Sequence, residues 1–198
     1  MKELIIYTIL AYMIGSIPTG YIVVKTAKGE DIRKIGSGST GATNVKRVMG
    51  KKWFFIVLLA DALKGALPVI LAKTYATQYT ELGLIPVIAA IAVIIGHSKS
   101  IFLKFSGGKS VASGVGTILA LNWQIGLLIA AIWGTITYFS KYVSLGSIIA
   151  LCVSPILMFL FKQPFAYVIY CLLGAIYITY LHRANIKRLL NGEENKVR

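Results

Sequence analysis

Long apolar stretches alternate with short polar connectors along the whole chain of 198 residues. The stretches lie at about 4–24, 53–72, 82–96, 111–121, 124–140, 143–161 and 165–181. About twenty apolar helical residues cross the ~30 Å hydrocarbon layer of a membrane. Backbone groups in lipid must be satisfied internally, and no alternating strand pattern is present. The pattern therefore predicts an all-α, polytopic integral membrane protein with seven transmembrane helices, forming one membrane-embedded domain over residues 1–198.

The stretch 111–140 leaves the helix count open between five and seven. Asn122-Trp123-Gln124 is either a tight outer turn between two helices or a polar interruption within one long helix. Pro18, Pro68 and Pro155 fall inside apolar stretches, where a proline is expected to kink or break a helix.

Composition agrees with a membrane protein, because 57% of the residues are hydrophobic and only 14% are charged. The formal net charge of +14 could indicate nucleic-acid binding. However, the basic residues lie in the connectors between apolar stretches and not along one soluble face, so we exclude a nucleic-acid partner. Cys152 and Cys171 lie inside apolar stretches and have no metal-ligand spacing.

The connectors differ strongly in positive charge. Most of the 21 Lys and Arg residues fall in 25–52, in 97–110 and after 181, whereas the alternate connectors hold few. Because cytoplasmic connectors are enriched in Lys and Arg, this predicts an outside N-terminus and a cytoplasmic C-terminus. Every glycine-rich polar segment then faces the cytoplasm.

The first basic connector combines glycines, hydroxyls and a guanidinium, a mixture that suits phosphate binding. Glycines permit backbone conformations in which successive N–H groups surround an anion, and an arginine adds a fork of donors. The candidate ligands are Gly36, Ser37, Gly38, Gly41, Thr43, Asn44 and Arg47.

A second connector contains Gly107-Gly108-Lys109-Ser110. It resembles the end of a nucleotide-binding P-loop, but that motif needs a glycine at position 103, which is Leu103, so we exclude a nucleotidase. What remains is a glycine turn that presents Lys109 at a helix start. His97, at the end of the preceding apolar stretch, either satisfies a backbone carbonyl or takes part in chemistry.

The last apolar stretch continues into a basic amphipathic tail. His182 and Asn185 are spaced to share one helix face, and the rest of the tail is expected to anchor at the membrane surface. Asp61 and Lys64 stand three residues apart inside the second apolar stretch, where ionisable groups are costly unless they pair or face a polar cavity. Both roles remain open for this pair.

Four segments together resemble the bacterial membrane glycerol-3-phosphate acyltransferases that use acyl phosphate as donor: Gly36–Arg47, Gly96–Gly116, Tyr142-Val-Ser-Leu145 and His182–Gly192. The resemblance implies acyl transfer to the 1-hydroxyl of sn-glycerol-3-phosphate, giving lysophosphatidic acid and phosphate, in the bacterial cytoplasmic membrane with the site facing the cytoplasm. It also implies no direct use of acyl-CoA or acyl-carrier protein. We expect membrane lipid as the surroundings and neither a metal nor a cofactor.

On this resemblance we assign roles to the candidate residues. Ser37 and neighbouring N–H groups hold the acyl phosphate, and Arg47 and Lys109 grip the phosphate of glycerol-3-phosphate. His182 and Asn185 position its glycerol end. Further candidates for substrate binding are Thr43, Asn44 and Ser144, with Gly36, Gly38, Gly41, Gly107 and Gly108 shaping the loops. Direct attack is favoured over an acyl-Ser37 intermediate because no histidine lies near Ser37 in the sequence. The proton acceptor stays open between His182 and the donor phosphate.

A transporter or channel for an anion is the main alternative, since glycine-broken helices with a basic inner mouth also suit anion passage. A transporter should continue its polar residues to the outer side, yet the connectors 73–81, 122–124 and 162–164 lack the glycine–hydroxyl–cation pattern. A structural scaffold would leave the polar residues at 36–47 and 97–110 unexplained. The sequence therefore favours the enzyme.

Overall fold

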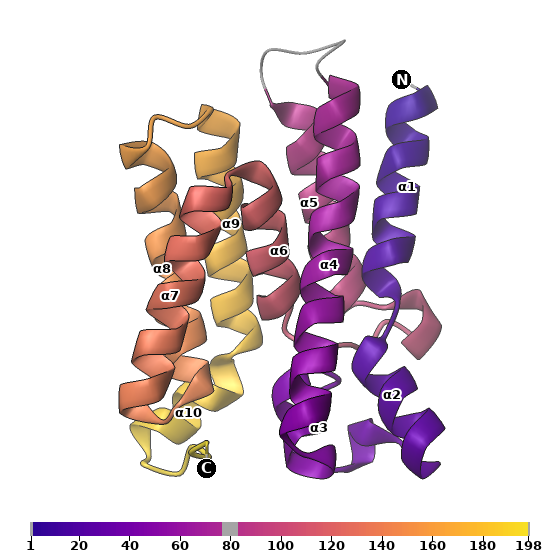
Figure 1. Cartoon of the computed structure of the whole chain (residues 1–198), viewed down its shortest axis with the longest axis vertical. Coiled ribbons are helices and arrows are strands. Elements are labelled where there is room, and N and C mark those ends of the chain that lie inside the picture. Colours follow the sequence, from indigo (N-terminus) through magenta and orange to yellow (C-terminus); the bar gives the residue numbers. More distant parts are fainter. Residues whose placement is uncertain (1, 77–82, 198) are drawn as a thin grey trace.

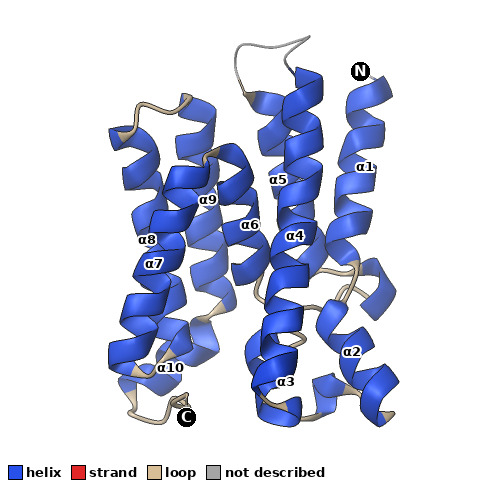
Figure 2. Ribbon diagram, in the orientation of Figure 1, coloured by secondary structure: helices blue, strands red, loops and turns tan. Residues whose placement is uncertain are grey.

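The computed structural model describes residues 2–76 and 83–197, and this part of the chain is built of helices. Within it, extended pairing is limited to one isolated bridge between Ser100 and Ser106 (Figure 2). In chain order the elements are α1 (Lys2–Ser16), α2 (Thr19–Lys28), η1 (Ile32–Lys34), α3 (Ala42–Met49), α4 (Lys51–Ala76), α5 (Leu84–Ser98), η2 (Ile101–Leu103), α6 (Val111–Leu121), α7 (Trp123–Ser140), α8 (Val143–Leu160), α9 (Phe165–Leu181) and α10 (Arg183–Leu190). The prediction of an all-α fold is confirmed.

Each of the seven apolar stretches is mainly helical where the structure describes it, and the first is broken between Ser16 and Thr19. By length and composition, four stretches in the described part can cross a membrane: Leu4–Lys28, Lys51–Thr74, Trp123–Ser140 and Val143–Leu160. A fifth arises if α9 and α10, which meet at an angle of 63°, count as one span. Helices α5 and α6 are apolar but shorter. The count of seven membrane crossings and the orientation therefore stay predictions, and much of the outer connector 73–81 lies outside the described residues.

The region around Asn122 is a turn between two helices. The side-chain oxygen of Asn122 accepts a hydrogen bond of 3.0 Å from the backbone N–H of Ile125 and so caps the start of α7. Of the two readings that the sequence left open, the turn is correct. Pro18 also acts as expected, because α1 ends at Ser16 and α2 begins at Thr19, whereas Pro68 and Pro155 lie inside continuous helices.

The helices form an elongated bundle in which α1, α4 and α5 lie beside one another and α7, α8 and α9 form a second group (Figure 1). Helix α6 packs against α4 and connects the two groups. The contact between α4 and α6 is close because Gly65 and Gly116 lack side chains; a Cβ on either would overlap the main chain of the other helix. Gly15 and Gly96 bring α1 and α5 together in the same way. Small residues at helix contacts are characteristic of membrane bundles.

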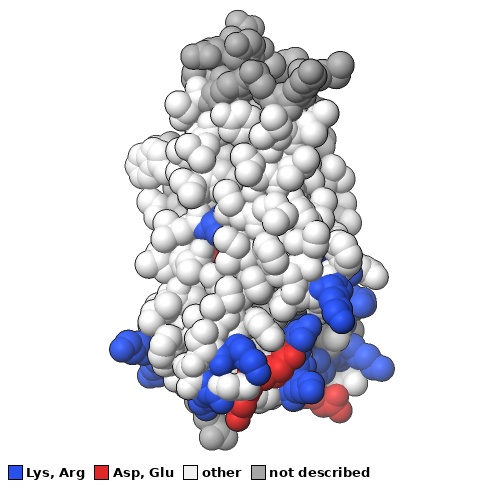
Figure 3. Space-filling view, turned by 90° about the vertical axis from the view of Figure 1, so that its right-hand side faces the viewer, with Lys and Arg blue, Asp and Glu red and all other residues white. Residues whose placement is uncertain are grey.

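Large apolar side chains remain exposed along the bundle, as expected for a surface that meets lipid. Phe55, Leu59 and Phe159 are 63%, 62% and 69% exposed. Charged side chains gather mainly at the end of the molecule that carries α2 and α3, and most of the remaining visible face is uncharged (Figure 3). The start of α1 lies at the opposite end of the bundle from α10 (Figure 1).

Asp61 and Lys64 pair inside the bundle, with 2.8 Å between the Lys64 Nζ and an Asp61 carboxylate oxygen. Lys64 also donates a hydrogen bond of 2.6 Å to the carbonyl oxygen of Ile17, at the break between α1 and α2. The Thr19 hydroxyl donates to Asp61 from the other side of the break. Since Pro18 interrupts the helical hydrogen bonds here, these side chains satisfy backbone and side-chain groups that would otherwise be costly to bury.

Candidate active site

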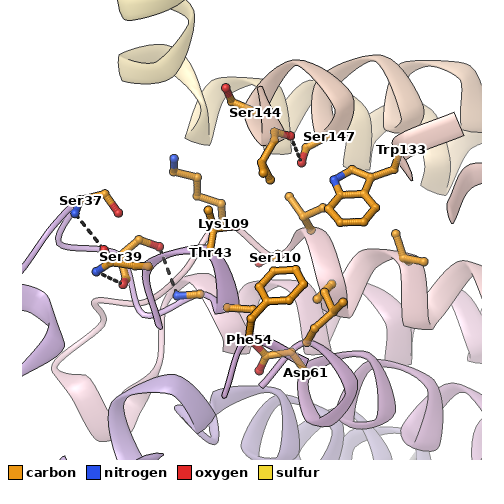
Figure 4. Close-up of a pocket in the computed structure, with 18 of the residues that line it drawn as sticks. Ser37, Ser39, Thr43, Phe54, Asp61, Lys109, Ser110, Trp133, Ser144 and Ser147 are labelled. Carbon is orange, nitrogen blue, oxygen red and sulfur yellow. Dashed lines mark hydrogen bonds between the residues drawn. The ribbon is translucent and has the colours of Figure 1, made fainter. Parts of the chain in front are cut away.

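A cavity of about 460 Å³ opens between α4 and the pair α7–α8, next to the charged end of the bundle. One part of its wall is apolar and the other is polar. The apolar part includes Phe54, Phe55, Leu58, Leu59, Val115 and Trp133. Figure 4 shows Lys109 reaching into the cavity between the loop that carries Ser37 and Ser39 and the helix that carries Ser144.

The loop before α3 is shaped by the buried side chain of Asn44. Its amide nitrogen donates hydrogen bonds of 2.9 Å to the carbonyl oxygens of Ile35 and Ser39, and its oxygen accepts one of 3.0 Å from the N–H of Ser37. Gly36 has φ +61°, and a Cβ there would overlap the Asn44 side-chain oxygen. Asn44 lines the cavity but its polar atoms are committed to the loop, so it acts here as the support of the loop.

This arrangement changes what the loop can offer to an anion. The N–H of Ser37 is already bonded to Asn44, and the N–H of Gly38 donates to the carbonyl of Ile35. The hydroxyl-bearing residues Ser37, Ser39 and Thr43 line the cavity instead. Helix α3 begins at Ala42, so its positive N-terminal end also meets the cavity.

Two cations face the cavity from opposite elements. Arg47 projects from α3 and is exposed, and no ion pair is found for it among the described residues. Lys109 comes from the segment before α6. Burial lowers the pKa of Lys109 from 10.5 to about 8; nearby Glu194 opposes this shift, and the positive charges of Arg188 and Arg47 add to it. An incoming phosphate would relieve the repulsion between these cations.

Lys109 belongs to a chain of hydrogen bonds that joins three elements. Its amine donates to the side-chain oxygen of Asn185, and the Asn185 amide nitrogen donates over 2.6 Å to Glu194. The same Glu194 oxygen accepts a bond of 2.9 Å from the Ser144 hydroxyl, at the start of α8. The predicted residues Lys109, Asn185 and Ser144, far apart in the sequence, are thus brought together.

His182 lies at the bend between α9 and α10 and is only 3% exposed. Its Nδ1 is 2.8 Å from the carbonyl oxygen of Ile178. Because a carbonyl can only accept, Nδ1 carries the proton and Nε2 is left as an acceptor. His182 and Asn185 both line the cavity.

Glu194 is the main site residue that the sequence did not reveal. Its carboxylate accepts hydrogen bonds from Asn185, Ser144 and Arg188, the last over 2.7 Å. Burial raises the pKa of this carboxyl, but the three hydrogen bonds outweigh burial and hold it below its usual value. The available signal was its rarity, since the chain has only seven acidic residues beside 21 basic ones.

Most of the predicted site residues line this one cavity: Ser37, Gly41, Thr43, Asn44, Arg47, Lys109, Ser144, His182 and Asn185. Gly36, Gly38, Gly107 and Gly108 are not part of its wall; they shape the loops that carry the others. Asp61 and His97 line it as well. In the described part of the chain, no three His, Cys, Asp or Glu side chains are grouped as metal ligands.

The arrangement combines cations and hydroxyls with an adjoining apolar groove. Such a site can hold phosphorylated groups at its polar end and a hydrocarbon chain along α4 and α7. It is suited to bringing a small anion to a lipid-linked one.

Comparison with known proteins shows the family to which this chain is similar. A sequence profile described as "Glycerol-3-phosphate acyltransferase" matches residues 5–192. Glycerol-3-phosphate acyltransferases of Trichormus variabilis and Thermotoga petrophila are each 45% identical, over 96% and 97% of this chain and 89% and 95% of their own. The crystal structure of PlsY (YgiH), an integral membrane glycerol 3-phosphate acyltransferase, in its glycerol 3-phosphate form has a TM-score of 0.93 at 34% identity, covering 99% of this chain and 96% of that one. Its lysophosphatidic acid form has a TM-score of 0.90 at 32% identity, with the same coverage.

Proposed function

The chain belongs to the glycerol-3-phosphate acyltransferase family and is a multi-pass integral membrane acyltransferase; we propose that it transfers a fatty acyl group from acyl phosphate to the 1-hydroxyl of sn-glycerol-3-phosphate. The hydroxyl oxygen forms a bond to the acyl carbonyl carbon, and the bond from that carbon to the phosphate oxygen breaks. The hydroxyl proton passes to a base. The products are lysophosphatidic acid and inorganic phosphate.

Glycerol-3-phosphate binds at the polar end of the cavity. Arg47 and Lys109 supply charge-assisted hydrogen bonds to its phosphate, which are the strong class of hydrogen bond. Asn185 is held in place by Lys109 and Glu194, so its amide is oriented before the substrate arrives. The glycerol 3-phosphate form of PlsY supports this acceptor.

The acyl donor lies along the apolar groove. Phe54, Leu58 and Trp133 offer an apolar wall for a fatty chain, and the hydroxyls of Ser37 and Ser39 face the neighbouring space. The positive end of α3 favours the donor phosphate there. The lysophosphatidic acid form of PlsY supports a lipid product but leaves the donor to be tested.

Catalysis consists mainly of alignment. Acyl phosphate is a mixed anhydride with a good leaving group, so the protein chiefly brings the hydroxyl to the carbonyl and stabilises the developing oxyanion. Cations between two phosphorylated substrates offset their mutual repulsion. The proton passes to Nε2 of His182 or to the departing phosphate. Direct attack requires no covalent intermediate on Ser37.

The same proposal places the protein in the bacterial cytoplasmic membrane, with residues 1–198 as one acyltransferase domain and the site on the cytoplasmic side. The concentration of Lys and Arg at the site's end of the molecule supports this orientation (Figure 3). Single cysteines placed at Lys104 and Lys162 in a cysteine-free variant test it. A membrane-impermeant maleimide should label position 162 and spare position 104 in intact cells; labelling of 104 alone would reverse the orientation.

The observation that carries the proposal is that Arg47, Lys109 and the Ser37 loop meet above an apolar groove in one cavity. The test supplies the purified protein in lipid with sn-glycerol-3-phosphate and either palmitoyl phosphate or palmitoyl-CoA. We expect lysophosphatidic acid and phosphate with palmitoyl phosphate alone. Product from palmitoyl-CoA alone would overturn the assigned donor. Absence of product with either donor would favour anion transport as the function.

A further inference from the structure

His97 is a buried residue of the cavity wall that the proposed chemistry does not use. It lies in the last turn of α5 and is 7% exposed. Its Nδ1 is 3.0 Å from the Ser113 hydroxyl on α6 and 3.7 Å from an Asp61 carboxylate oxygen on α4. The ring therefore has fixed neighbours on two other helices.

The glycine turn before Lys109 rests directly on His97. The N–H of Gly108 donates a hydrogen bond of 3.1 Å to the His97 carbonyl oxygen. A Cβ at Gly108 would overlap Nε2 of the imidazole, and a Cβ at Gly107 would overlap the His97 carbonyl oxygen. The Gly107-Gly108 turn thus packs against both the ring and the main chain of His97.

Asp61 links this support to the other polar loop. It pairs with Lys64 and accepts a hydrogen bond from Thr19 at the start of α2. Helix α2 in turn packs so closely on the loop before α3 that a Cβ at Gly20 would overlap the Thr40 carbonyl oxygen. Asp61 therefore lies between the support of the Lys109 turn and the helix that packs on the loop before α3.

We propose that His97 is a positioning residue: its imidazole, oriented by the Ser113 hydroxyl, holds the Gly107-Gly108 turn and so places the Lys109 amine in the phosphate site. This inference rests on the proposed function only through the acceptor, glycerol-3-phosphate. The ring supports the turn and makes no contact with the reacting atoms.

A size exchange between positions 97 and 108 tests the contact. No positive φ excludes alanine at Gly107 or Gly108, so Gly108→Ala differs from the wild type mainly by the overlap with the ring. His97→Asn keeps a polar atom near the Nδ1 position for Ser113 but removes the ring edge that meets Gly108. The double variant has room for the added methyl group.

The readouts are the KM for glycerol-3-phosphate and the thermal stabilisation that glycerol-3-phosphate alone confers. We expect Gly108→Ala to raise the KM about tenfold or more with a smaller effect on kcat, on the scale of one lost charge-assisted hydrogen bond. His97→Asn loses the ring that supports the turn and should itself raise the KM about fivefold, or about 1 kcal/mol. Adding Gly108→Ala to His97→Asn should then cost no further affinity. Equal penalties in both backgrounds would overturn the proposal.

Gly107→Ala is the matched control. Its added methyl group meets the main-chain oxygen of residue 97, which every residue has. His97→Asn should therefore not lower the KM of Gly107→Ala for glycerol-3-phosphate. Restoration of Gly107→Ala by His97→Asn would contradict the assigned contact.

Ser113→Ala supplies a second reading if Gly108→Ala does not accumulate, because Ser113 is buried outside the cavity wall. Losing the hydroxyl partner of Nδ1 should raise the KM for glycerol-3-phosphate several-fold at unchanged kcat; an unchanged KM would overturn the proposal. The thermal stabilisation by glycerol-3-phosphate needs no acyl donor, so a wrong donor would appear as absent turnover in the wild type and leave this readout intact.

Discussion

Lys109 donates a hydrogen bond to the side-chain oxygen of Asn185, which joins the segment before α6 to α10 across the cavity. Asn185 in turn donates a hydrogen bond to Glu194, which also accepts one from Ser144. The phosphate site is therefore assembled from three parts of the chain whose relative positions depend on one another. Substitution of a residue that binds substrate should therefore differ in its effects from substitution of a residue that holds the binding residues in place.

The lowered pKa of the Lys109 amine should make the binding of glycerol-3-phosphate pH-dependent. Burial lowers the pKa of its amine to about 8, so the amine is charged and able to bind phosphate below that pH and becomes neutral above it. We expect kcat/KM for glycerol-3-phosphate to fall above about pH 8, approaching tenfold per pH unit. Lys109→Arg keeps its charge, so its kcat/KM should stay flat up to pH 9.5. An identical decline in both proteins would assign the titration to another group.

Arg47→Ala and Lys109→Ala should each weaken the use of glycerol-3-phosphate more than the use of acyl phosphate. A lost charge-assisted hydrogen bond is worth about 1.5–3 kcal/mol, so the KM for glycerol-3-phosphate should rise about 10- to 100-fold. Lys51→Ala removes an exposed charge from the same end of the molecule and should leave both KM values within about twofold. Unchanged kinetics in both Arg47→Ala and Lys109→Ala would remove these residues from the site.

Gly36→Ala should abolish most of the activity by disturbing the Ser37 loop. The added Cβ meets the Asn44 side-chain oxygen. Alanine at position 36 would also keep the positive φ of Gly36, which costs about 1 kcal/mol or more from strain alone. Gly29→Ala is the control, because Gly29 also has a positive φ of +74° but has no atom near a Cβ. Gly29→Ala should lose stability by a similar strain cost and keep the wild-type kcat. Equal losses of kcat in the two variants would show that backbone strain, and not the contact with Asn44, causes the effect.

Glu194→Gln should destabilise the C-terminal segment and raise the KM for glycerol-3-phosphate. The amide cannot accept all the hydrogen bonds that the carboxylate accepts from Ser144, Asn185 and Arg188, at a cost of about 1–3 kcal/mol. Melting curves in detergent should show a Tm lower by several degrees. The neighbouring exposed Glu193, changed to Gln, should melt like the wild type. A wild-type Tm with a raised KM would mean that Glu194 contacts substrate directly.

The apolar pattern was sufficient to predict the helices because lipid forces the backbone of each long apolar stretch into a helix. It also gave the lengths of α5 and α6, which are shorter than a full span, but it ended the first stretch at 24, whereas α2 continues to Lys28. Membrane depth depends on how the helices pack and tilt, which apolar content alone does not determine.

The site residues could be predicted where the chemistry is local. Glycines, hydroxyls and cations within a few residues identified the loops around Ser37 and Lys109, and helical spacing paired His182 with Asn185. The role of Asn44 depends on how the loop folds around its bonds to Ser37, Ile35 and Ser39. The role of Glu194 depends on Ser144, 50 residues away in the chain. No spacing rule reports a contact between residues so far apart in the sequence.

The central claim is that both phosphorylated substrates occupy the one cavity at the same time and react directly. Initial rates over a grid of acyl phosphate and glycerol-3-phosphate concentrations test this claim most directly. Direct attack within a ternary complex predicts double-reciprocal lines that intersect, and no phosphate release without acceptor. Parallel lines, with a burst of phosphate in the absence of glycerol-3-phosphate, would indicate an acyl-enzyme on a residue such as Ser37 and would contradict the account.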